Sequence, residues 1–146
     1  MNIRKILDSD MVACAVILES GYNQTPYNEV FKEGTALRYI QGKFAYCKDS
    51  SFVAIDDRGA IVGFVLVALS TWSDGPQAVI EEIVVSPNYQ YTGIGTLLLR
   101  QAHEYIISTG STSAMLWVKN NEKLLHFYTK HGYTVADDYV VMFRDF

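Results

Sequence analysis

Apolar side chains follow two different periods along this chain. Runs that alternate with polar residues, or that are rich in β-branched residues, predict strands, and spacings of three and four residues predict helices. The first half predicts a strand over 2–7, a helix from Asp8 or Asp10 to Gly21, a second helix from Pro26 to about Gln41, a strand over 51–56 and a strand over 60–71. The second half predicts a strand over 79–85, a helix over about 97–110, a strand over 113–118, a short helix from Asn120 or Asn121 to His131, and strands over 133–135 and 139–143.

This order of elements predicts a mixed α/β (α+β) fold. We find no linker, internal repeat or low-complexity segment, so we expect a single domain over residues 1–146. Asp57-Arg58-Gly59 is a hairpin turn, which makes the strands on either side of it antiparallel. Thr25-Pro26 matches a helix cap followed by proline at the first helical position, and places the start of the second helix there. Gly34 lies inside this predicted helix and weakens it.

The stretch from Ala78 to Gly110 carries the strongest chemical signal. Its strand is stopped by Ser86-Pro87, since proline cannot donate to a sheet ladder. A glycine-bearing loop, Gln90 to Gly95, then leads directly into a helix. The first N–H groups of a helix lack internal partners, and glycines allow a ligand to approach them, so the unit suits an anion such as a pyrophosphate. By itself a Gly-x-Gly at this place is also consistent with a simple tight turn.

Two common phosphate-binding motifs are excluded. A P-loop needs Gly-Lys-Ser/Thr, and this loop has Gly95-Thr96-Leu97 without a lysine. A dinucleotide fingerprint needs a third glycine, which is missing here.

Composition narrows the class of protein further. A net charge of −4 and a pI near 5.3 argue against a general nucleic-acid binder. Cys14 and Cys47 lack metal-ligand spacing and are interpreted as reduced core thiols, and the three histidines share no metal spacing either, so we expect no metal. The longest apolar run, 60–69, is about half a membrane span, and the N-terminal residues show no apolar signal segment. We therefore expect a cytoplasmic protein that binds neither nucleic acid nor membrane.

With these residues in place, the chain resembles the GNAT superfamily of acetyl-CoA-dependent N-acetyltransferases. Ile80-Glu-Glu-Ile-Val-Val85-Ser-Pro87 followed by Gln90-x-x-Gly93-x-Gly95 is similar to the strand and Arg/Gln-x-x-Gly-x-Gly/Ala loop of that family. Asn121, Phe127-Tyr128 and Gly132-Tyr133 resemble its asparagine-bearing helix with the Phe-Tyr and Gly-Phe/Tyr pairs. The order of strands and helices agrees as well, so the resemblance covers essentially the whole chain.

The resemblance implies a mostly antiparallel twisted sheet that splays between its fourth and fifth strands, flanked by about four helices. Acetyl-CoA would lie in that split, as acyl donor. Because Gln90-Tyr91-Thr92 stands where arginine-rich loops are common, backbone amides and the helix dipole would provide most of the anion binding. The residues implied to bind acetyl-CoA are Ile83, Val84, Val85, Gln90, Tyr91, Thr92, Gly93, Ile94, Gly95, Thr96, Asn121 and Tyr128. For Asn121, a helix N-cap is the structural alternative.

The same resemblance implies catalytic roles for a tyrosine and a glutamate. Tyr128 would protonate the departing thiolate, with packing under the sheet as the structural alternative. Glu81 or Glu82 would accept the proton of the amine. Adjacent strand residues face opposite sides unless a bulge intervenes, so we expect only one of them to face the acceptor, with Glu81 slightly preferred. A solvated salt bridge at the rim is the alternative for either.

The acceptor is expected to be a small cationic amine. The segment between the first two helices offers Tyr22, Tyr27 and Glu29, and aromatic faces with carboxylates suit an ammonium group. These tyrosines could instead only pack the helix ends. No cysteine stands at a matched site position, which favours direct attack in a ternary complex. The alternatives are a protein N-terminal or lysine acetyltransferase and a non-catalytic acyl-CoA sensor. A homodimer is a further possibility.

Overall fold

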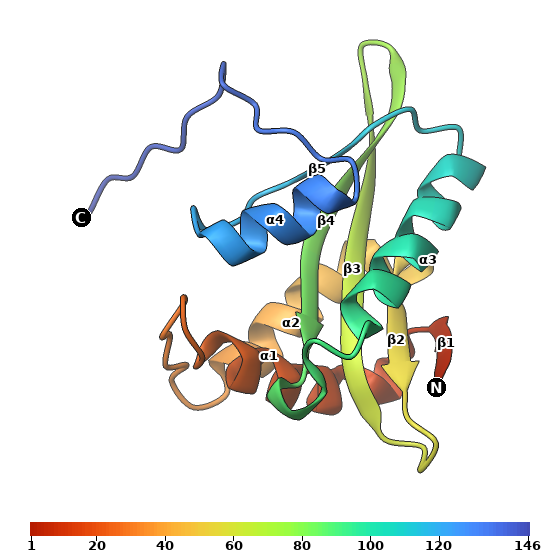
Figure 1. The fold of residues 1–146 in the computed structure, drawn as a ribbon, viewed down its shortest axis with the longest axis vertical. Coiled ribbons are helices and arrows are strands. Elements are labelled where there is room, and N and C mark those ends of the chain that lie inside the picture. The colour runs from red at the N-terminus through yellow and green to blue at the C-terminus, as the bar shows by residue number, and fades with distance from the viewer.

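Helices cover both faces of a five-stranded sheet whose strands follow one another in chain order, β1-β2-β3-β4-β5 (Figure 1). The computed structural model describes residues 1–146. The strands are β1 (Asn2–Lys5), β2 (Phe52–Ile55), β3 (Ile61–Trp72), β4 (Gly75–Val85) and β5 (Ala114–Leu116). The helices are α1 (Met11–Tyr22), α2 (Thr35–Cys47), α3 (Ile94–Ser108) and α4 (Glu122–Lys130).

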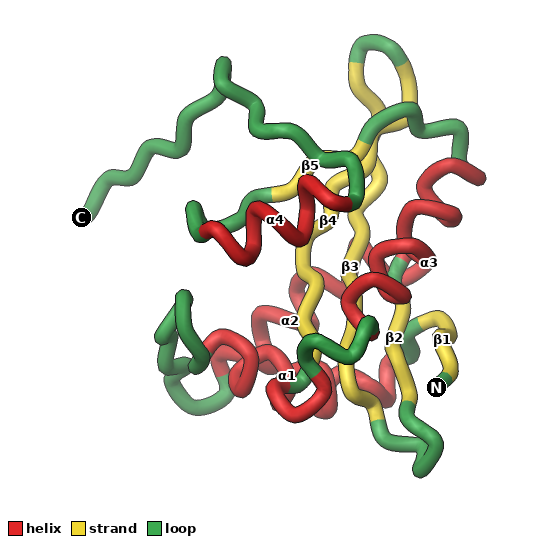
Figure 2. The backbone as a smooth tube through the Cα atoms, in the orientation of Figure 1, coloured by secondary structure: helices red, strands yellow, loops and turns green.

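The sheet is mixed, as the sequence predicts. The pairs β1–β2, β2–β3 and β3–β4 are antiparallel, and β4–β5 is parallel. β5 pairs only with residues 78–80 of β4, after which the two strands separate. The predicted splay between the fourth and fifth strands is therefore confirmed, and Figure 2 shows the chain leaving β5 as a loop.

Two apolar cores lie on opposite faces of the sheet. The first packs α1 and α2 against the sheet and contains both buried cysteines, Cys14 and Cys47. The second packs α3 on the other face, with residues of α4 at its margin. α1 lies close to the sheet at its C-terminal end, where a Cβ added to Gly21 would come within 2.6 Å of Val84 Cγ1. Glycine at this position lets the end of α1 reach the centre of β4.

The second helix begins later than the sequence predicts. α2 starts at Thr35, and Gly34 is its N-cap, with φ = 72°. Pro26 lies instead in a loop in which the N–H groups of Tyr27 and Asn28 both donate to the Gln24 carbonyl. Asn28 has φ = 52°, a left-handed conformation that an α-helix does not accept. The prediction was wrong because Thr25-Pro26 also suits a turn, and the local sequence does not distinguish the two.

The two final strands are also absent. Residues 133–135 and 139–143 form no strand (Figure 2). Tyr133 is half-buried against the core on the α3 face, and residues 139–143 are exposed, with Phe143 at 93% exposure. Their β-branched and aromatic residues favour a strand, but a strand also needs a partner edge. β4 is conversely longer than predicted and β3 ends one residue later, because the expected loop over 72–76 is a hairpin turn at Ser73-Asp74. None of the helices is long and apolar enough to pass through a membrane.

A partly buried ion pair joins the first strand to the first helix. Asp10 is 5% exposed, and its carboxylate accepts two hydrogen bonds from the Arg4 guanidinium, at 2.6 and 2.9 Å, and one from the Leu7 N–H at 2.8 Å. The Arg4 hydrogen bonds hold the pKa of Asp10 below its usual range. The pair therefore stabilises the folded state when Asp10 is ionised.

We expect Asp10→Asn to lower the free energy of unfolding at pH 7 by about 1 to 3 kcal/mol, because Arg4 loses its charged partner. A group with a lowered folded-state pKa contributes stability above its unfolded pKa and loses it as the pH falls. Thermal unfolding at several pH values should therefore show a deficit in the variant that shrinks below about pH 4. A pH-independent deficit would contradict an electrostatic role for the pair.

Candidate active site

β4 presents free backbone groups where β5 leaves it. In an antiparallel pair, residues bonded to the partner strand alternate with residues whose N–H and C=O groups point to the other edge. The Ser86 N–H donates to the carbonyl of Val62 in β3, at 2.9 Å, and this bond shows which residues of β4 face β3. The backbone groups of Ile83 and Val85 consequently point to the open edge. There the Val85 carbonyl accepts a 3.2 Å hydrogen bond from the Gln90 side-chain amide.

The loop after β4 ends in a run of unpaired amides. None of the N–H groups of residues 91–96 has a hydrogen-bond acceptor within the chain, and the first bond of the α3 turn runs from Leu97 N–H to the Gly93 carbonyl. Tyr91 and Gly93 adopt left-handed conformations, with φ of 61° and 90°, which turn the loop into the helix. Unpaired amides at the positive end of a helix dipole are an arrangement that suits an anion.

A β-bulge places Glu81 and Glu82 on the same face of the sheet. Leu66 is opposite Glu82 and Val67 is opposite Ile80, so Glu81 is an extra residue in β4. Both carboxylates consequently face α1 and α2. The expectation that only one of them could face the site is wrong, because the alternation of side chains that it assumed is interrupted here.

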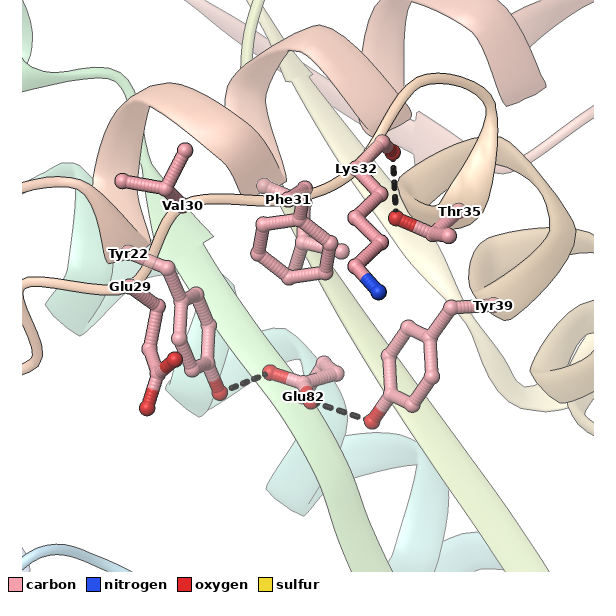
Figure 3. Close-up of a pocket in the computed structure, with 9 residues that line it drawn as sticks. Tyr22, Glu29, Val30, Phe31, Lys32, Thr35, Tyr39 and Glu82 are labelled. Atoms are coloured by element: carbon pink, nitrogen blue, oxygen red, sulfur yellow. Dashed lines mark hydrogen bonds between the residues drawn. The ribbon is translucent and has the colours of Figure 1, made fainter.

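The two carboxylates have different partners. Glu81 forms an ion pair with Lys43 of α2, with 2.5 Å between Oε2 and Nζ. Glu82 has no cation in contact and is only 9% exposed. It accepts hydrogen bonds from two phenols, Tyr22 at 2.9 Å and Tyr39 at 2.5 Å, which approach from either side (Figure 3).

The pKa of Glu82 reflects this environment. Burial raises the pKa of the Glu82 carboxyl above its usual range, and the two phenol hydrogen bonds act in the opposite direction by stabilising the ionised form. A carboxylate with a raised pKa is a better proton acceptor than a solvated one near neutral pH.

Glu82 lies between two cavities. The outer cavity, of about 370 Å³, is lined by Leu18, Tyr22, Glu29, Val30, Phe31, Lys32, Thr35, Tyr39 and Glu82 (Figure 3). The inner cavity, of about 230 Å³, is lined by Tyr22, Tyr27, Tyr39, Lys43, Ile80, Glu81, Glu82, Ile83, Leu116, Trp117 and Tyr128. Three side chains, Tyr22, Tyr39 and Glu82, border both, so they form the wall between the cavities.

Tyr128 of α4 reaches the inner cavity from the opposite side. Its ring packs edge-on against Phe127 and Tyr133, with centroids 5.1 and 5.7 Å away. Burial raises the pKa of the phenol, so it is protonated at neutral pH. The hydroxyl makes no hydrogen bond within the chain and is available as a donor to a ligand in the cavity.

Asn121 has a defined structural role. Its Oδ1 accepts hydrogen bonds from the N–H groups of Lys123 and Leu124, at 3.1 and 3.4 Å, which makes it the N-cap of α4. The cap fixes the start of the helix that carries Tyr128. The helix also lies against α3, because the Phe127 ring faces Gly95, where an added Cβ would come within 3.5 Å of its Cζ.

The predicted acceptor residues meet at the cavities. Tyr27 lines the inner cavity and Glu29 the outer one, while Tyr22 lines both. The loop that carries Tyr27 contacts Lys119, which lies between β5 and α4. The Lys119 ammonium donates to the Pro26 carbonyl at 2.7 Å and lies 5.8 Å from the centre of the Tyr27 ring.

Sequence reasoning missed Tyr39 and Lys43. Their four-residue spacing puts them on one face of α2, but nothing local separates that face from any other polar helix face. No group of three or more His, Cys, Asp or Glu side chains is arranged to hold a metal ion.

Comparison with known proteins identifies the family. The model of the acetyltransferase (GNAT) family matches residues 16–133, and the chain belongs to this family. It is 33% identical over 84 residues to the streptothricin acetyltransferase of Streptomyces lavendulae, an alignment that covers 57% of this chain and 43% of that protein. It is also 33% identical over 89 residues to an uncharacterized N-acetyltransferase of Methanocaldococcus jannaschii, covering 58% and 39%. The matches thus span less than half the length of these relatives.

Solved structures share the fold. A transcriptional regulator from Bacillus halodurans superimposes with a TM-score of 0.76 at 20% identity, covering 98% of this chain and 99% of the other. The PaiA N-acetyltransferase from Thermoplasma acidophilum, in complex with coenzyme A, superimposes with a TM-score of 0.72 at 21% identity, covering 93% and 91%. At these identities the likeness shows the fold alone.

Proposed function

We propose that this protein is an N-acetyltransferase that transfers an acetyl group from acetyl-CoA to the primary amine of a small cationic molecule, by direct attack in a ternary complex. One observation carries the proposal. The inner cavity brings together a buried carboxylate, Glu82, a protonated phenol, Tyr128, and the strand edge at Ile83. These are the proton acceptor, the proton donor and the docking edge that the reaction needs.

The chain fits acetyl-CoA on two grounds. The outward-facing backbone groups of Ile83 and Val85 can bond the amides of a pantetheine arm as an added strand would. The unpaired N–H groups of residues 91–96 can hold the pyrophosphate, in a loop whose side chains bring no positive charge. Acetyl-CoA supplies an acyl group activated as a thioester.

Glu82 is the proton acceptor in this proposal. The amine reaches the site as an ammonium ion and must lose a proton before its nitrogen can attack. Glu82 takes that proton, directly or through water. The nitrogen–carbon bond then forms, and the carbon–sulfur bond of the thioester breaks. The nitrogen gives up a second proton as it becomes an amide, and this proton restores the Tyr128 phenol, directly or through water, after Tyr128 has protonated the thiolate. Glu81 is less suited to this role because Lys43 holds its carboxylate in an ion pair.

Tyr128 is the proton donor. The departing thiolate needs a proton, and the Tyr128 phenol faces the same cavity as Glu82 with its hydroxyl unengaged. An acetyl-cysteine intermediate has no support. Cys14 and Cys47 are buried in the core under α1 and α2, outside both cavities, and burial raises the pKa of each thiol to about 12.

The surroundings of the cavities favour a cationic acceptor. Glu29 and Glu82 provide carboxylates, and Tyr22 and Tyr27 provide ring faces, with centroids 4.5 Å apart. Carboxylates attract an ammonium group by charge, and tyrosine rings attract it by cation–π contact. Lys32 also lines the outer cavity and would repel a ligand that carries positive charge along its whole length. We therefore expect a compact amine rather than a long basic peptide.

We expect Tyr128→Phe to retain the fold and the affinity for acetyl-CoA but to slow turnover by about 10²- to 10⁴-fold, the usual cost of losing a general acid. Steady-state release of free thiol measures turnover, and calorimetry measures acetyl-CoA binding. Turnover above about half the parent rate, with chemistry as the slow step, would exclude the proton-donor role.

We expect Glu82→Gln to lower kcat/KM by about 10²-fold or more, because glutamine has nearly the size of glutamate but cannot accept the proton. Glu81→Gln is the matched variant one residue away, and we expect a loss of no more than about 10-fold, arising from the unpaired Lys43. Thermal unfolding should show that both variants fold. The opposite ranking of the two losses would transfer the base role to Glu81.

Acceptor choice is tested with polyamines, aminoglycosides, amino sugars and short peptides at matched concentrations, by thiol release. We expect the highest kcat/KM with a small cationic amine, and we expect Tyr27→Ala and Glu29→Gln to lower it mainly through KM, by about 3- to 30-fold, as lost ground-state contacts do. Activity confined to peptides would indicate a protein acetyltransferase. Acetyl-CoA binding without thiol release from any amine would indicate a sensor.

A further inference from the structure

We propose that Tyr22 and Tyr39 form a phenol clamp that positions Glu82 as the proton acceptor of the reaction. The inference rests on the role proposed for Glu82, and it assigns to both tyrosines a function in catalysis exerted through that carboxylate. Tyr22 extends from the end of α1 and Tyr39 from α2, so each of the two helices on this face contributes one donor (Figure 3).

The geometry of the clamp fixes the carboxylate. The Tyr22 hydroxyl donates to Oε2 at 2.9 Å, and the Tyr39 hydroxyl donates to Oε1 at 2.5 Å. With one donor on each oxygen, the carboxylate cannot rotate about its terminal bond without breaking a hydrogen bond. A carboxylate oxygen can accept two hydrogen bonds, so each retains a place for the proton of the amine or for a bridging water.

The tyrosines are themselves held in place. The Tyr22 ring packs against Tyr27, with centroids 4.5 Å apart, and edge-on against Phe31 at 6.1 Å. The Lys43 ammonium lies 5.6 Å from the centre of the Tyr39 ring while it is bound to Glu81. The orientation of Glu82 therefore also depends on residues that contact the two tyrosines, such as Tyr27 and Lys43.

The clamp also has an electrostatic effect. Burial raises the pKa of Glu82, and the two phenols hold it down by bonding to the ionised form. Removing one phenol takes away one of the hydrogen bonds that lower the pKa of Glu82 and leaves the effect of burial, so this pKa should rise further. The other titratable or charged groups around this carboxylate are Lys43 of α2, Glu81 of β4, Tyr27 of the loop, Tyr128 of α4, and Glu29 and Lys32 at the outer cavity.

The test measures the Glu82 pKa directly. In protein labelled with ¹³C at glutamate side-chain carboxyls, the Glu82 resonance is assigned by its loss in Glu82→Gln and is titrated by NMR. We expect Tyr22→Phe and Tyr39→Phe each to raise the Glu82 pKa by about 0.5 to 1 unit, and the double variant to raise it more. The acid limb of kcat/KM against pH should move upward with it.

The matched control is Tyr89→Phe. It deletes another tyrosine–carboxylate hydrogen bond, from Tyr89 to Asp56 at 2.9 Å, away from both cavities. We expect it to leave the Glu82 pKa and the acid limb unchanged. All the variants keep the aromatic ring, so near-parent melting temperatures are expected, and a purely structural role would change those temperatures without moving the pKa.

The possible failures are distinguishable. An unchanged Glu82 pKa in the single and double variants of an active enzyme would overturn the clamp alone. A raised pKa with an unmoved acid limb would overturn its role in the reaction. A parent protein that releases no thiol with any amine would contradict the proposed function and, with it, the catalytic role of the clamp, whatever the NMR titration shows.

Discussion

The site depends on the separation of β4 from β5. Pairing stops at Ile80, and beyond that point the backbone groups of Ile83 and Val85 face an edge without a partner strand. An unpaired strand edge inside a protein is costly unless a partner satisfies its backbone groups. Here the edge opens onto the inner cavity and continues into the loop of unpaired amides that begins α3. Because the strands separate, Tyr128 of α4 can line the same cavity as residues of β4.

A single extra residue in β4 decides how the acidic pair is used. Because Glu81 is bulged, two consecutive carboxylates lie under the same two helices. Two bare carboxylates so close together would repel, and the structure gives them different partners, a lysine for Glu81 and two phenols for Glu82. The charge of Glu81 is thereby balanced by a lysine, whereas Glu82 is kept buried without a cation, a state that costs stability and suits the proton acceptor proposed above.

Much of the architecture and several of the residues that line the cavities could be predicted from the sequence. The strand–glycine loop–helix unit, the β2–β3 hairpin and the capped helix of Tyr128 have local signals, because turns, caps and short periods involve neighbouring residues. Local signals failed where one motif serves two purposes, as Thr25-Pro26 does, and where a strand needs a distant partner, as residues 139–143 do. The motifs that resemble the GNAT family are such local signals, and the match to the family model over residues 16–133 agrees with them.

The sequence by itself determined which residues are candidates for the chemistry: Glu81, Glu82, Tyr128 and the amides after Gln90. Only the tertiary structure decided how they act together. The bulge depends on the register between β3 and β4, and the bond from Tyr39 to Glu82 joins residues 43 positions apart. Such contacts depend on the packing of α1 and α2 against the sheet, which no short stretch of sequence encodes. The two glutamates are therefore equivalent in the sequence, and only the folded chain gives them different neighbours.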